Sequence, residues 1–413
     1  MAQRPFSYPP SILARRPVAV IALAQLLGTS LWFSANSAFE ELTRVWNVSA
    51  AEIGWLTGAV QSGFILGTLI LALTGLADRF RASHLFVASA LLGALFNALF
   101  AWSAQGLTEA LLWRFLVGLS LAGIYPVGMK LVVSWAPERT GQALAQLVAM
   151  LTLGTALPHG LQELGADLSW QVVISASSML ALAGAGLIFL LGDGAHLPAR
   201  QAGSGSGSPL RVSEAFKEPL FRAAAWGYFG HMWELYAFWT VVPLLVASSV
   251  LVSETSSIGV SGMAFGVIGI GALGCLIGGA LSRRFGSAAV ALSALALSCL
   301  CAVLFALFWR SLPPVGLGLL LLVWGASVVA DSPQFSALAA KACPPAIIGA
   351  SLAILNAIGF AITVVSIAAV TALFERVQLD AAWLLVPGPV AGLLGYGLTR
   401  KRAASRLKSK GAP

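Results

Sequence analysis

The chain has 413 residues, of which 58% are hydrophobic and only 10% are charged, whereas about 25% of residues are charged in an ordinary soluble domain. A globular core cannot hold this much apolar side chain, so the composition excludes a soluble or disordered protein and indicates one embedded in a lipid bilayer. The formal charge of +8 then concerns topology and lipid headgroups, and no nucleic-acid partner is expected. The four cysteines form no CxxC pair, so we expect no disulfide framework, metal or cofactor.

About twelve apolar runs follow along the chain, each close to the roughly 20 residues that a helix needs to cross the hydrocarbon layer. Boundary signals separate several of them: Ser49 and Glu52 form an S-x-x-E capping box before the second run, and Pro137 and Pro198 lie in breaks. The predicted spans are 18–38, 53–74, 86–104, 108–133, 141–162, 171–191, 220–247, 257–281, 288–309, 315–337, 347–372 and 382–399.

Basic residues gather on one side of this alternating path. If the N-terminus is cytoplasmic, 19 of the 24 basic residues lie inside, two fall within a span, and only Arg44, Arg310 and Arg376 lie outside. The positive-inside rule therefore predicts a multi-pass protein of the cell inner (plasma) membrane with both termini in the cytoplasm. A cleaved signal peptide is the alternative for the first run, but the run is long and no clear A-x-A site closes it.

A hydrophilic stretch divides the chain into halves of nearly equal length. The predicted parts are a bundle over 1–191, a cytoplasmic linker over 192–218 with a Gly-Ser run, a second bundle over 219–399 and a basic tail over 400–413. The pattern G-x-S-x5-P at 118–126 recurs at 325–333, and the loop sequence at 76–80 is answered at 281–285. Two matches at nearly one offset indicate six-helix halves related by duplication.

This organisation, with an acidic and basic loop after the second helix, resembles the major facilitator superfamily of secondary transporters. The family's loop signature, G-x-L-a-D-R-x-G-[RK]-[RK], corresponds to 74–83, where Leu76 to Arg79 match and both glycines are replaced, by Thr74 and Arg81. The resemblance implies an all-α membrane protein of about twelve transmembrane helices in two pseudo-symmetric six-helix bundles.

The same resemblance predicts a cytoplasmic gate formed by the two copies of this loop. The second copy, 279–286, keeps both glycines but has an arginine where the acid is expected. A loop carboxylate can accept hydrogen bonds from helix N-terminal amides or from an arginine of the other half, so it can latch one gate. The alternative is that these charges only mark topology. The predicted gate residues are Asp78, Arg79, Arg81, Arg283 and Arg284.

Two helix patterns bear on coupling and direction. Arg114 is followed by small residues or proline every four positions, Gly118, Ala122 and Pro126, which is similar to the R-x3-G pattern of proton-driven members. The stretch 154–160 contains part of the G-x3-G-P-x2-G-G pattern of exporters. These patterns favour proton coupling and, more weakly, export.

Ionisable residues inside predicted spans are expensive, at least about 2.5 kcal/mol each on insertion scales, so each needs a partner, a water-filled cavity or a role. Glu234 lies about 14 residues into its span, near the midplane where such folds place their sites. His231 precedes it by three positions and shares its helix face. We interpret His231 and Glu234 as the leading proton-coupling or substrate pair, and the alternative is a structural hydrogen-bonded pair.

The other three intramembrane charges allow different interpretations. Arg114 is too deep to reach water easily, so a carboxylate partner, an anionic substrate or a water-filled cavity is implied. Lys130 lies close enough to the inner surface to snorkel. Asp331, beside Pro333, is an inner gate, a second proton site or a local cap.

Neutral polar and aromatic side chains complete the predicted substrate cavity. Aromatic residues crowd the seventh span, but they cannot all face one cavity. The predicted cavity members are Asn36, Gln61, Trp233, Tyr236, Trp239 and Asn356.

The sequence therefore predicts a monomeric secondary transporter that moves a small-molecule substrate by alternating access, with protons as the coupling ion. Export of an amphipathic organic compound by proton antiport is the first hypothesis. Uptake of a small organic anion by proton symport, with Arg114 opposite Glu234, is the alternative, and sodium coupling or uniport stays open. A receptor or a membrane-embedded enzyme is remote, because no nucleophile–base constellation, phosphate loop or metal spacing is present in the sequence.

Overall fold

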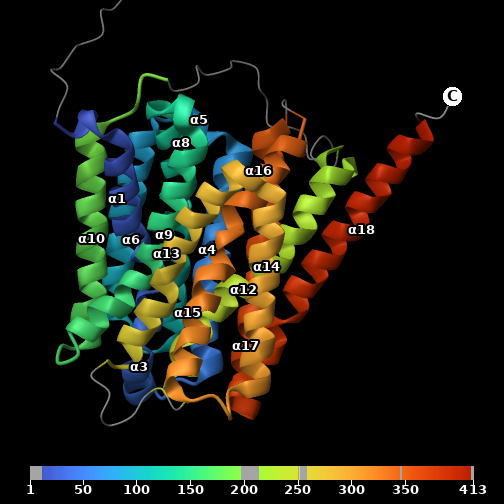
Figure 1. Ribbon diagram of the computed structural model, residues 1–413. Coiled ribbons are helices and arrows are strands. Elements are labelled where there is room, and N and C mark those ends of the chain that lie inside the picture. Colours follow the sequence, from blue (N-terminus) through green and yellow to red (C-terminus); the bar gives the residue numbers. More distant parts are fainter. Residues whose placement is uncertain (1–11, 197–213, 250, 252–257, 345–346, 411–413) are drawn as a thin grey trace, which may run out of the picture.

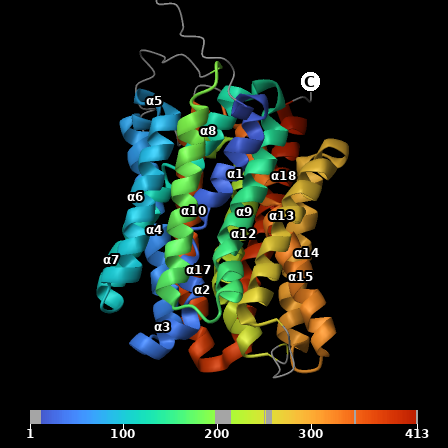
Figure 2. The same cartoon turned by 90° about the vertical axis from the view of Figure 1, so that its left-hand side faces the viewer.

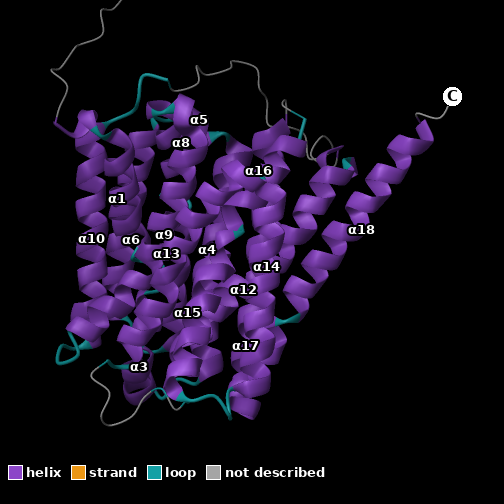
Figure 3. Ribbon diagram, viewed as in Figure 1, coloured by secondary structure: helices purple, strands orange, loops and turns teal. Residues whose placement is uncertain are grey.

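A computed structural model describes residues 12–196, 214–249, 251, 258–344 and 347–410 of the chain. Throughout these residues the regular structure is helical, without a strand (Figure 3). The long helices run side by side, and residue 12 and the end of the last helix lie at the same end of the bundle (Figure 1). We call this end the termini face and the opposite end, where α3 lies, the α3 face. The Gly-Ser run of the predicted linker lies outside the described residues.

The first group of helices, which we call the N-half, begins with the 3-10 turn η1 (Ile12–Arg15) and ends at Leu191. Its helices are α1 (Pro17–Thr29), α2 (Ser34–Ser37), α3 (Phe39–Trp46), α4 (Ala50–Thr74), α5 (Leu76–Arg79), α6 (Ala82–Ser103), α7 (Leu107–Leu121), α8 (Tyr125–Trp135), α9 (Thr140–Leu164) and α10 (Trp170–Leu191).

The second group, the C-half, begins at Pro219. Its helices are α12 (Pro219–Ala247), α13 (Val260–Phe285), α14 (Ser287–Phe308), α15 (Pro314–Ala330), α16 (Ser332–Ala342), α17 (Ile348–Val377) and α18 (Pro387–Lys410), with the 3-10 helix η4 (Gln378–Leu385) between the last two. Helix α18 continues into the predicted basic tail, because alanine, arginine and lysine are good helix formers outside the membrane as well as inside it.

Nine helical segments among the described residues are long and apolar enough to cross a membrane, and one of them, Ile348–Arg402, contains both α17 and α18. Helix α1 is a shorter apolar helix. Helix α12 has the length but not the hydropathy, because tryptophan, tyrosine, His231 and Glu234 interrupt its apolar sequence. The expected all-α membrane architecture is thus confirmed, and the polar residues that interrupt α12 include two of the predicted site.

Three of the predicted spans are broken helices, and the first of them, 18–38, is α1 and α2. The span predicted at 108–133 is α7 and α8, and the span predicted at 315–337 is α15 and α16. In both, the proline of the duplicated G-x-S-x5-P pattern, Pro126 or Pro333, is the second residue after the break. Proline has no N–H to donate and its ring clashes with the preceding turn, so the repeated motif produces a break at the same place in each half.

The two halves meet along two helix pairs. Helix α4 packs on α17, and α9 packs on α13, as the adjacent ribbons of α9 and α13 show in both views (Figures 1 and 2). At the start of α4 the predicted capping box is present: Ser49 accepts from the Glu52 amide, and the Glu52 carboxylate accepts from the Ser49 amide at 2.7 Å. The packing of α4 on α17 and of α9 on α13 holds the halves together at the α3 face.

Candidate substrate cavity and buried charges

A cavity of about 660 Å³ lies between the halves, lined from the N-half by α8 and α9 and from the C-half by α12, α13, α16 and α17. Its rim includes Gln142, Ala280 and Arg283, which are exposed and belong to the ends of α9 and α13 nearest the termini face. Its deepest residues include the buried Trp239 of α12. The cavity is therefore open toward the termini face and closed toward the α3 face.

The lining of this cavity includes many aromatic and amide side chains. Glutamines and one asparagine offer hydrogen bonds, and Arg283 is the one Asp, Glu, Lys, Arg or His residue among the described residues of its lining. The aromatic and amide members are Tyr125, Gln142, Gln146, Tyr228, Tyr236, Trp239, Gln334, Asn356 and Phe360.

Three of the six predicted cavity residues, Tyr236, Trp239 and Asn356, line the cavity, and the other three do not. Trp233 points to the other side of α12, where its indole N–H donates to the Leu384 carbonyl at 2.7 Å. The remaining two are buried in the N-half, beyond the cavity wall. The Asn36 amide donates to Thr57 Oγ1 at 2.8 Å, and neither amide atom of Gln61 has a partner among the described residues.

An aromatic stack ends the cavity on the side of the α3 face. Trp32 of the N-half stacks on Tyr236 and Phe360 of the C-half, with ring centroids 5.6 and 5.9 Å apart. Phe64 of the N-half packs against Trp32 and against Phe360, with ring centroids 4.9 and 4.5 Å apart. Since Trp32 has no exposed surface and Phe64 has 2%, this stack seals the cavity from the α3 face.

His231 and Asp331 form a buried ion-pair contact, although the sequence suggested Glu234 as the partner of His231. His231 Nδ1 lies 2.8 Å from Asp331 Oδ1, and both side chains are fully buried. The contact joins α12 to the break between α15 and α16. Met232 and Ser332, the residues that follow the pair in sequence, line the cavity.

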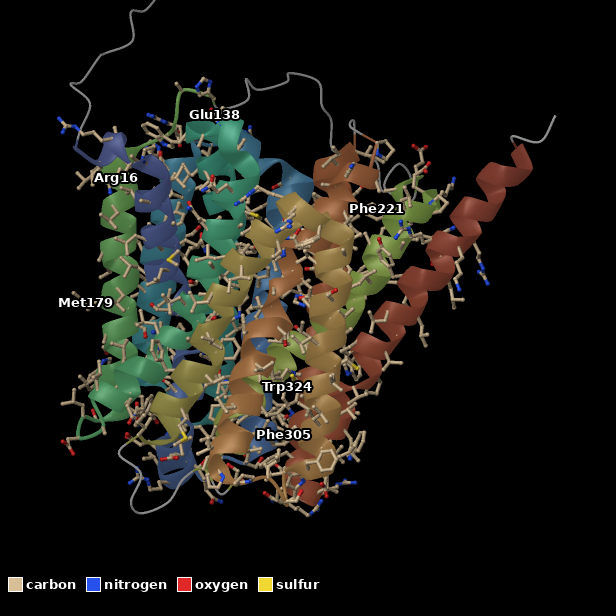
Figure 4. The ribbon with its side chains drawn as sticks, in the orientation of Figure 1. Arg16, Glu138, Met179, Phe221, Phe305 and Trp324 are labelled. Atoms are coloured by element: carbon tan, nitrogen blue, oxygen red, sulfur yellow. The ribbon has the colours of Figure 1, made fainter. Side chains whose placement is uncertain are left out.

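Glu234 points away from the cavity into the C-half. Its carboxylate accepts hydrogen bonds from Ser298 Oγ of α14 at 2.8 Å and from the Trp324 indole N–H of α15 at 2.7 Å. Trp324, labelled in Figure 4, lies near Phe305, with ring centroids 5.8 Å apart. The predicted pairing of Glu234 with His231 is therefore wrong, because a three-residue offset separates them around α12 enough for different neighbouring helices to contact each.

Arg114 is fully buried, but its partners are backbone and amide oxygens, and no carboxylate among the described residues bonds to it. Its two terminal nitrogens donate to the carbonyls of Leu31 and Trp32, to Ser34 Oγ and to Asn97 Oδ1, at 2.5 to 3.1 Å. These oxygens lie at the break between α1 and α2 and on α6. The guanidinium thus satisfies the free carbonyls of a broken helix, and it does not line the cavity.

The predicted loop motif is only partly visible as a contact network. The side chain of Asp78 lies outside the described part of the structure, and Arg79 and Arg284 are exposed. Arg81 Nε lies 3.0 Å from Oδ2 of Asp193, which follows α10 at the start of the predicted linker. Of the predicted gate residues whose side chains the structure describes, Arg283 is the one that lines the cavity.

Lys130, interpreted as a snorkelling residue, reaches the same loop from α8. Its Nζ donates to the carbonyl of Ala77 at 2.5 Å. This bond holds the loop against the helix that follows the proline break of the N-half.

Several site residues were not predicted from the sequence. Ser298 and Trp324 belong to apolar helices, and nothing in the sequence marks them as site residues. The structure identifies them as the hydrogen-bond donors to Glu234. Gln142 and Gln146 are four positions apart on α9 and both line the cavity. That i, i+4 spacing of amides in an otherwise apolar helix is the signal that could have indicated them.

A duplicated helical bundle with a central cavity and buried ionisable residues is the construction of a secondary transporter. The sequence matches the Major Facilitator Superfamily over residues 21–369. The protein belongs to this family, and it is a transporter and not an enzyme.

Similar proteins carry transporter names. The chain is 35% identical over 114 residues to the niacin transporter NiaP of Acinetobacter baylyi, a match that covers 27% of the chain and 25% of that protein. It is 27% identical over 169 residues to the putative uncharacterized transporter YgaY of Escherichia coli, covering 40% of the chain and 41% of that protein. The matches thus span less than half the length of these relatives.

Solved structures confirm the fold. The xylose transporter XylE from E. coli, in an inward open conformation, superposes with a TM-score of 0.73 at 14% identity, covering 94% of this chain and 96% of XylE. The human organic anion transporter MFSD10 gives a TM-score of 0.67 at 19% identity, covering 95% of this chain and 100% of that one.

Proposed function

We propose that this transporter moves a small organic solute by alternating access, as a monomer whose bundles over 1–191 and 219–399 rock about the central cavity, and that protons drive it. The observation that carries proton coupling is the contact between His231 and Asp331, two fully buried ionisable side chains 2.8 Å apart. Buried ion pairs contribute little net stability, so stability alone does not explain why this pair is present, and a role in proton coupling does.

The pair is placed so that a proton can change the cavity wall. A proton taken up by Asp331 changes its contact with His231 and so changes the link between α12 and the break that precedes α16. Met232 and Ser332 follow the pair and line the cavity, so a shift of either helix moves the substrate site. Glu234, hydrogen-bonded one turn further along α12, is a second acid whose protonation would loosen α12 from α14 and α15.

The cavity lining supports an aromatic or amphipathic substrate that is uncharged or anionic. Aromatic faces bind planar groups, and the amides of Gln142, Gln146, Gln334 and Asn356 can bond to polar substituents. Within the described part of the chain the lining contains no acid, and its one cation is Arg283 at the rim. A cationic substrate would therefore enter a low-dielectric space without a counter-charge.

Export by proton antiport remains the proposed direction, on the strength of the R-x3-G face around Arg114 and the partial exporter pattern at 154–160. Proton-symport uptake of an organic anion is the second candidate, supported by Arg283 at the rim and by relatives named as a niacin transporter and an organic anion transporter. In that case Arg283 would replace Arg114 as the anion-attracting residue, since Arg114 bonds to backbone oxygens outside the cavity.

The termini face is proposed to lie in the cytoplasm of a cell with this protein in its inner membrane, because the basic loops collect there. Reporter fusions after residue 410 and within the α3-face loop between α9 and α10 test this. A cytoplasmic signal from the first fusion and an external signal from the second are expected, and the reverse pattern would refute the orientation.

The function is tested in proteoliposomes that contain a pH-sensitive dye. Aromatic acids, uncharged aromatic compounds and aromatic cations are added outside, and the lumenal pH is followed. Antiport and symport move protons in opposite directions for the same solute, so the sign of the pH change separates the two candidates. No response to any acid or uncharged compound, with a response to cations, would overturn the proposed substrate class.

The coupling residues are tested by Asp331→Asn and Glu234→Gln, which keep size and hydrogen bonding but remove titration. Asp380→Asn, at the α3 face, is the matched control. We expect proton movement to fall at least about tenfold in Asp331→Asn while solute exchange in the absence of a pH gradient persists. Proton coupling through this pair is refuted if Asp331→Asn retains full pH-driven flux.

A further inference from the structure

Two matching contacts join the halves at the α3 face, and neither belongs to the cavity or to the buried charges. Glu163, in the last turn of α9, accepts hydrogen bonds from the backbone amides of Gly259 and Gly262, both at 2.8 Å. These glycines begin α13 of the C-half. Glu375, in the last turn of α17, accepts from the backbone amide of Ala51 at 2.8 Å, where α4 of the N-half begins.

The two contacts are equivalents under the internal duplication. Gly259 follows Ala51 by 208 positions in the sequence, and Glu375 follows Glu163 by 212. In each, a carboxylate at the C-terminal end of one helix caps the N-terminus of a helix from the other half. A single such contact could arise by chance, but two at symmetry-related places, each crossing between the halves, indicate one device built twice.

Physical chemistry gives these contacts strength and direction. The first amides of a helix have no intrahelical acceptor and carry the positive end of the helix dipole, so they bind a carboxylate well. The short approach also depends on glycine: a Cβ on Gly262 would lie 2.8 Å from Cδ of Glu163. At the equivalent position of α4, a Cβ on Gly54 would collide with Thr371 of α17. Both helix starts are thus shaped for close contact across the interface.

We propose that Glu163 and Glu375 are paired latches that keep the α3 face closed while the cavity is open to the termini face. Because each half moves as a packed bundle, rocking that opens the α3 face separates both carboxylates from their amides together. The three amides and the two carboxylates then return to water. The latches therefore favour the state described here and raise the free energy of the state that opens toward the α3 face.

The test measures how often the α3 face opens. Thr371 is fully buried between α17 and α4, and the native cysteines are buried as well. In a Thr371→Cys background, the rate of alkylation by a polar maleimide is proportional to the open population when opening and closing are fast. The measurement is made on the purified full chain in detergent without substrate or pH gradient, so it does not depend on the proposed proton coupling.

Glu163→Gln and Glu375→Gln are compared with Glu109→Gln. Glu109 accepts from the Gln105 amide at 2.8 Å, also at the α3 face but within the N-half, so the control loses the same kind of bond without touching the interface. We expect alkylation to accelerate about tenfold for Glu163→Gln, equivalent to about 1.4 kcal/mol. Glu375→Gln is expected to give less, because that carboxylate bonds to one backbone amide and not two, and the double variant is expected to give the most.

Two further measurements separate a latch from a merely structural contact: the melting temperature, and the distance between spin labels on the two halves. Spin labels at Val45 and Val315, exposed residues of the two halves, are expected to show a larger long-distance population in the double variant, while the melting temperature matches that of Glu109→Gln. Unchanged alkylation in both single variants, or equal acceleration in the Glu109→Gln control, would overturn the proposal.

Discussion

Replacing Arg114 by methionine tests whether this residue is structural, as its contacts indicate, or handles substrate and protons, as its sequence pattern suggests. Methionine keeps much of the apolar stem but removes every donor. Trp32 O then loses its one hydrogen-bond donor among the described residues, while the single hydroxyl hydrogen of Ser34 stays available to either the Leu31 carbonyl or Asn97 Oδ1. The break between α1 and α2 would be left with an unsatisfied carbonyl in a dry interior.

The size of the effect follows from these bonds. An orphaned buried carbonyl costs about 1–3 kcal/mol, and the loss of a charge-assisted bond at each of two further oxygens costs about 1 kcal/mol. Removal of a buried cation that has no carboxylate partner offsets part of this. We therefore expect a net loss of roughly 2–4 kcal/mol of stability for Arg114→Met. Arg114→Lys keeps the charge but not the planar fork, so its stability is expected to lie between that of the wild type and of Arg114→Met.

Chemical unfolding in detergent measures the stability of both variants, and proteoliposome flux at a temperature where all remain folded measures transport. Transport is expected to fall only in proportion to the folded fraction. A methionine variant as stable as the wild type but unable to transport would refute this reasoning, because Arg114 would then act on the substrate or the proton.

Two further substitutions test local contacts. Trp324→Phe keeps an aromatic ring but removes the indole bond to Glu234, so we expect a stability loss of about 1–2 kcal/mol, measured by the same unfolding assay; no loss would mean that the bond is not retained in detergent. Gly118→Ala places a methyl group into the Val60 carbonyl of α4, whereas Gly186→Ala on α10 meets open space. Gly118→Ala is expected to cost at least about 1–3 kcal/mol of stability and to lower the yield of folded protein. Gly186→Ala, the control, is expected to stabilise by up to about 1 kcal/mol. Equal yields of the two variants would contradict the packing of α4 on α7.

The sequence predicted the helices well, because membrane spans are set by local composition. The capping box of Ser49 and Glu52 was readable for the same reason, since both partners lie within one turn. The break at Pro333 was not predicted as a helix end, although the proline was noticed. Whether a proline kinks or interrupts a helix depends on which neighbours satisfy the freed carbonyls, and those neighbours are distant in sequence.

The candidate site was predictable only as a set of unusual residues. Burial of a charge shows that a partner must exist, but the partner of His231 is 100 positions away at Asp331, and that of Glu234 is a tryptophan. Periodicity places residues on a helix face without saying which helix covers that face. Trp233 shows the limit: it lies between cavity residues in the chain and still bonds to Leu384 on the opposite side.

The aromatic stack of Trp32, Phe64, Tyr236 and Phe360 has a consequence for proton leakage across the membrane. A water-filled cavity that reaches deep into a membrane invites leakage, because a file of water molecules conducts protons by hopping. Rings whose centroids lie 4.5 to 5.9 Å apart offer no continuous file of donors and acceptors along which such hopping can run. Tyr236 and Phe360 also line the cavity, so the rings that close its inner end are at the same time a barrier to proton leakage across the membrane.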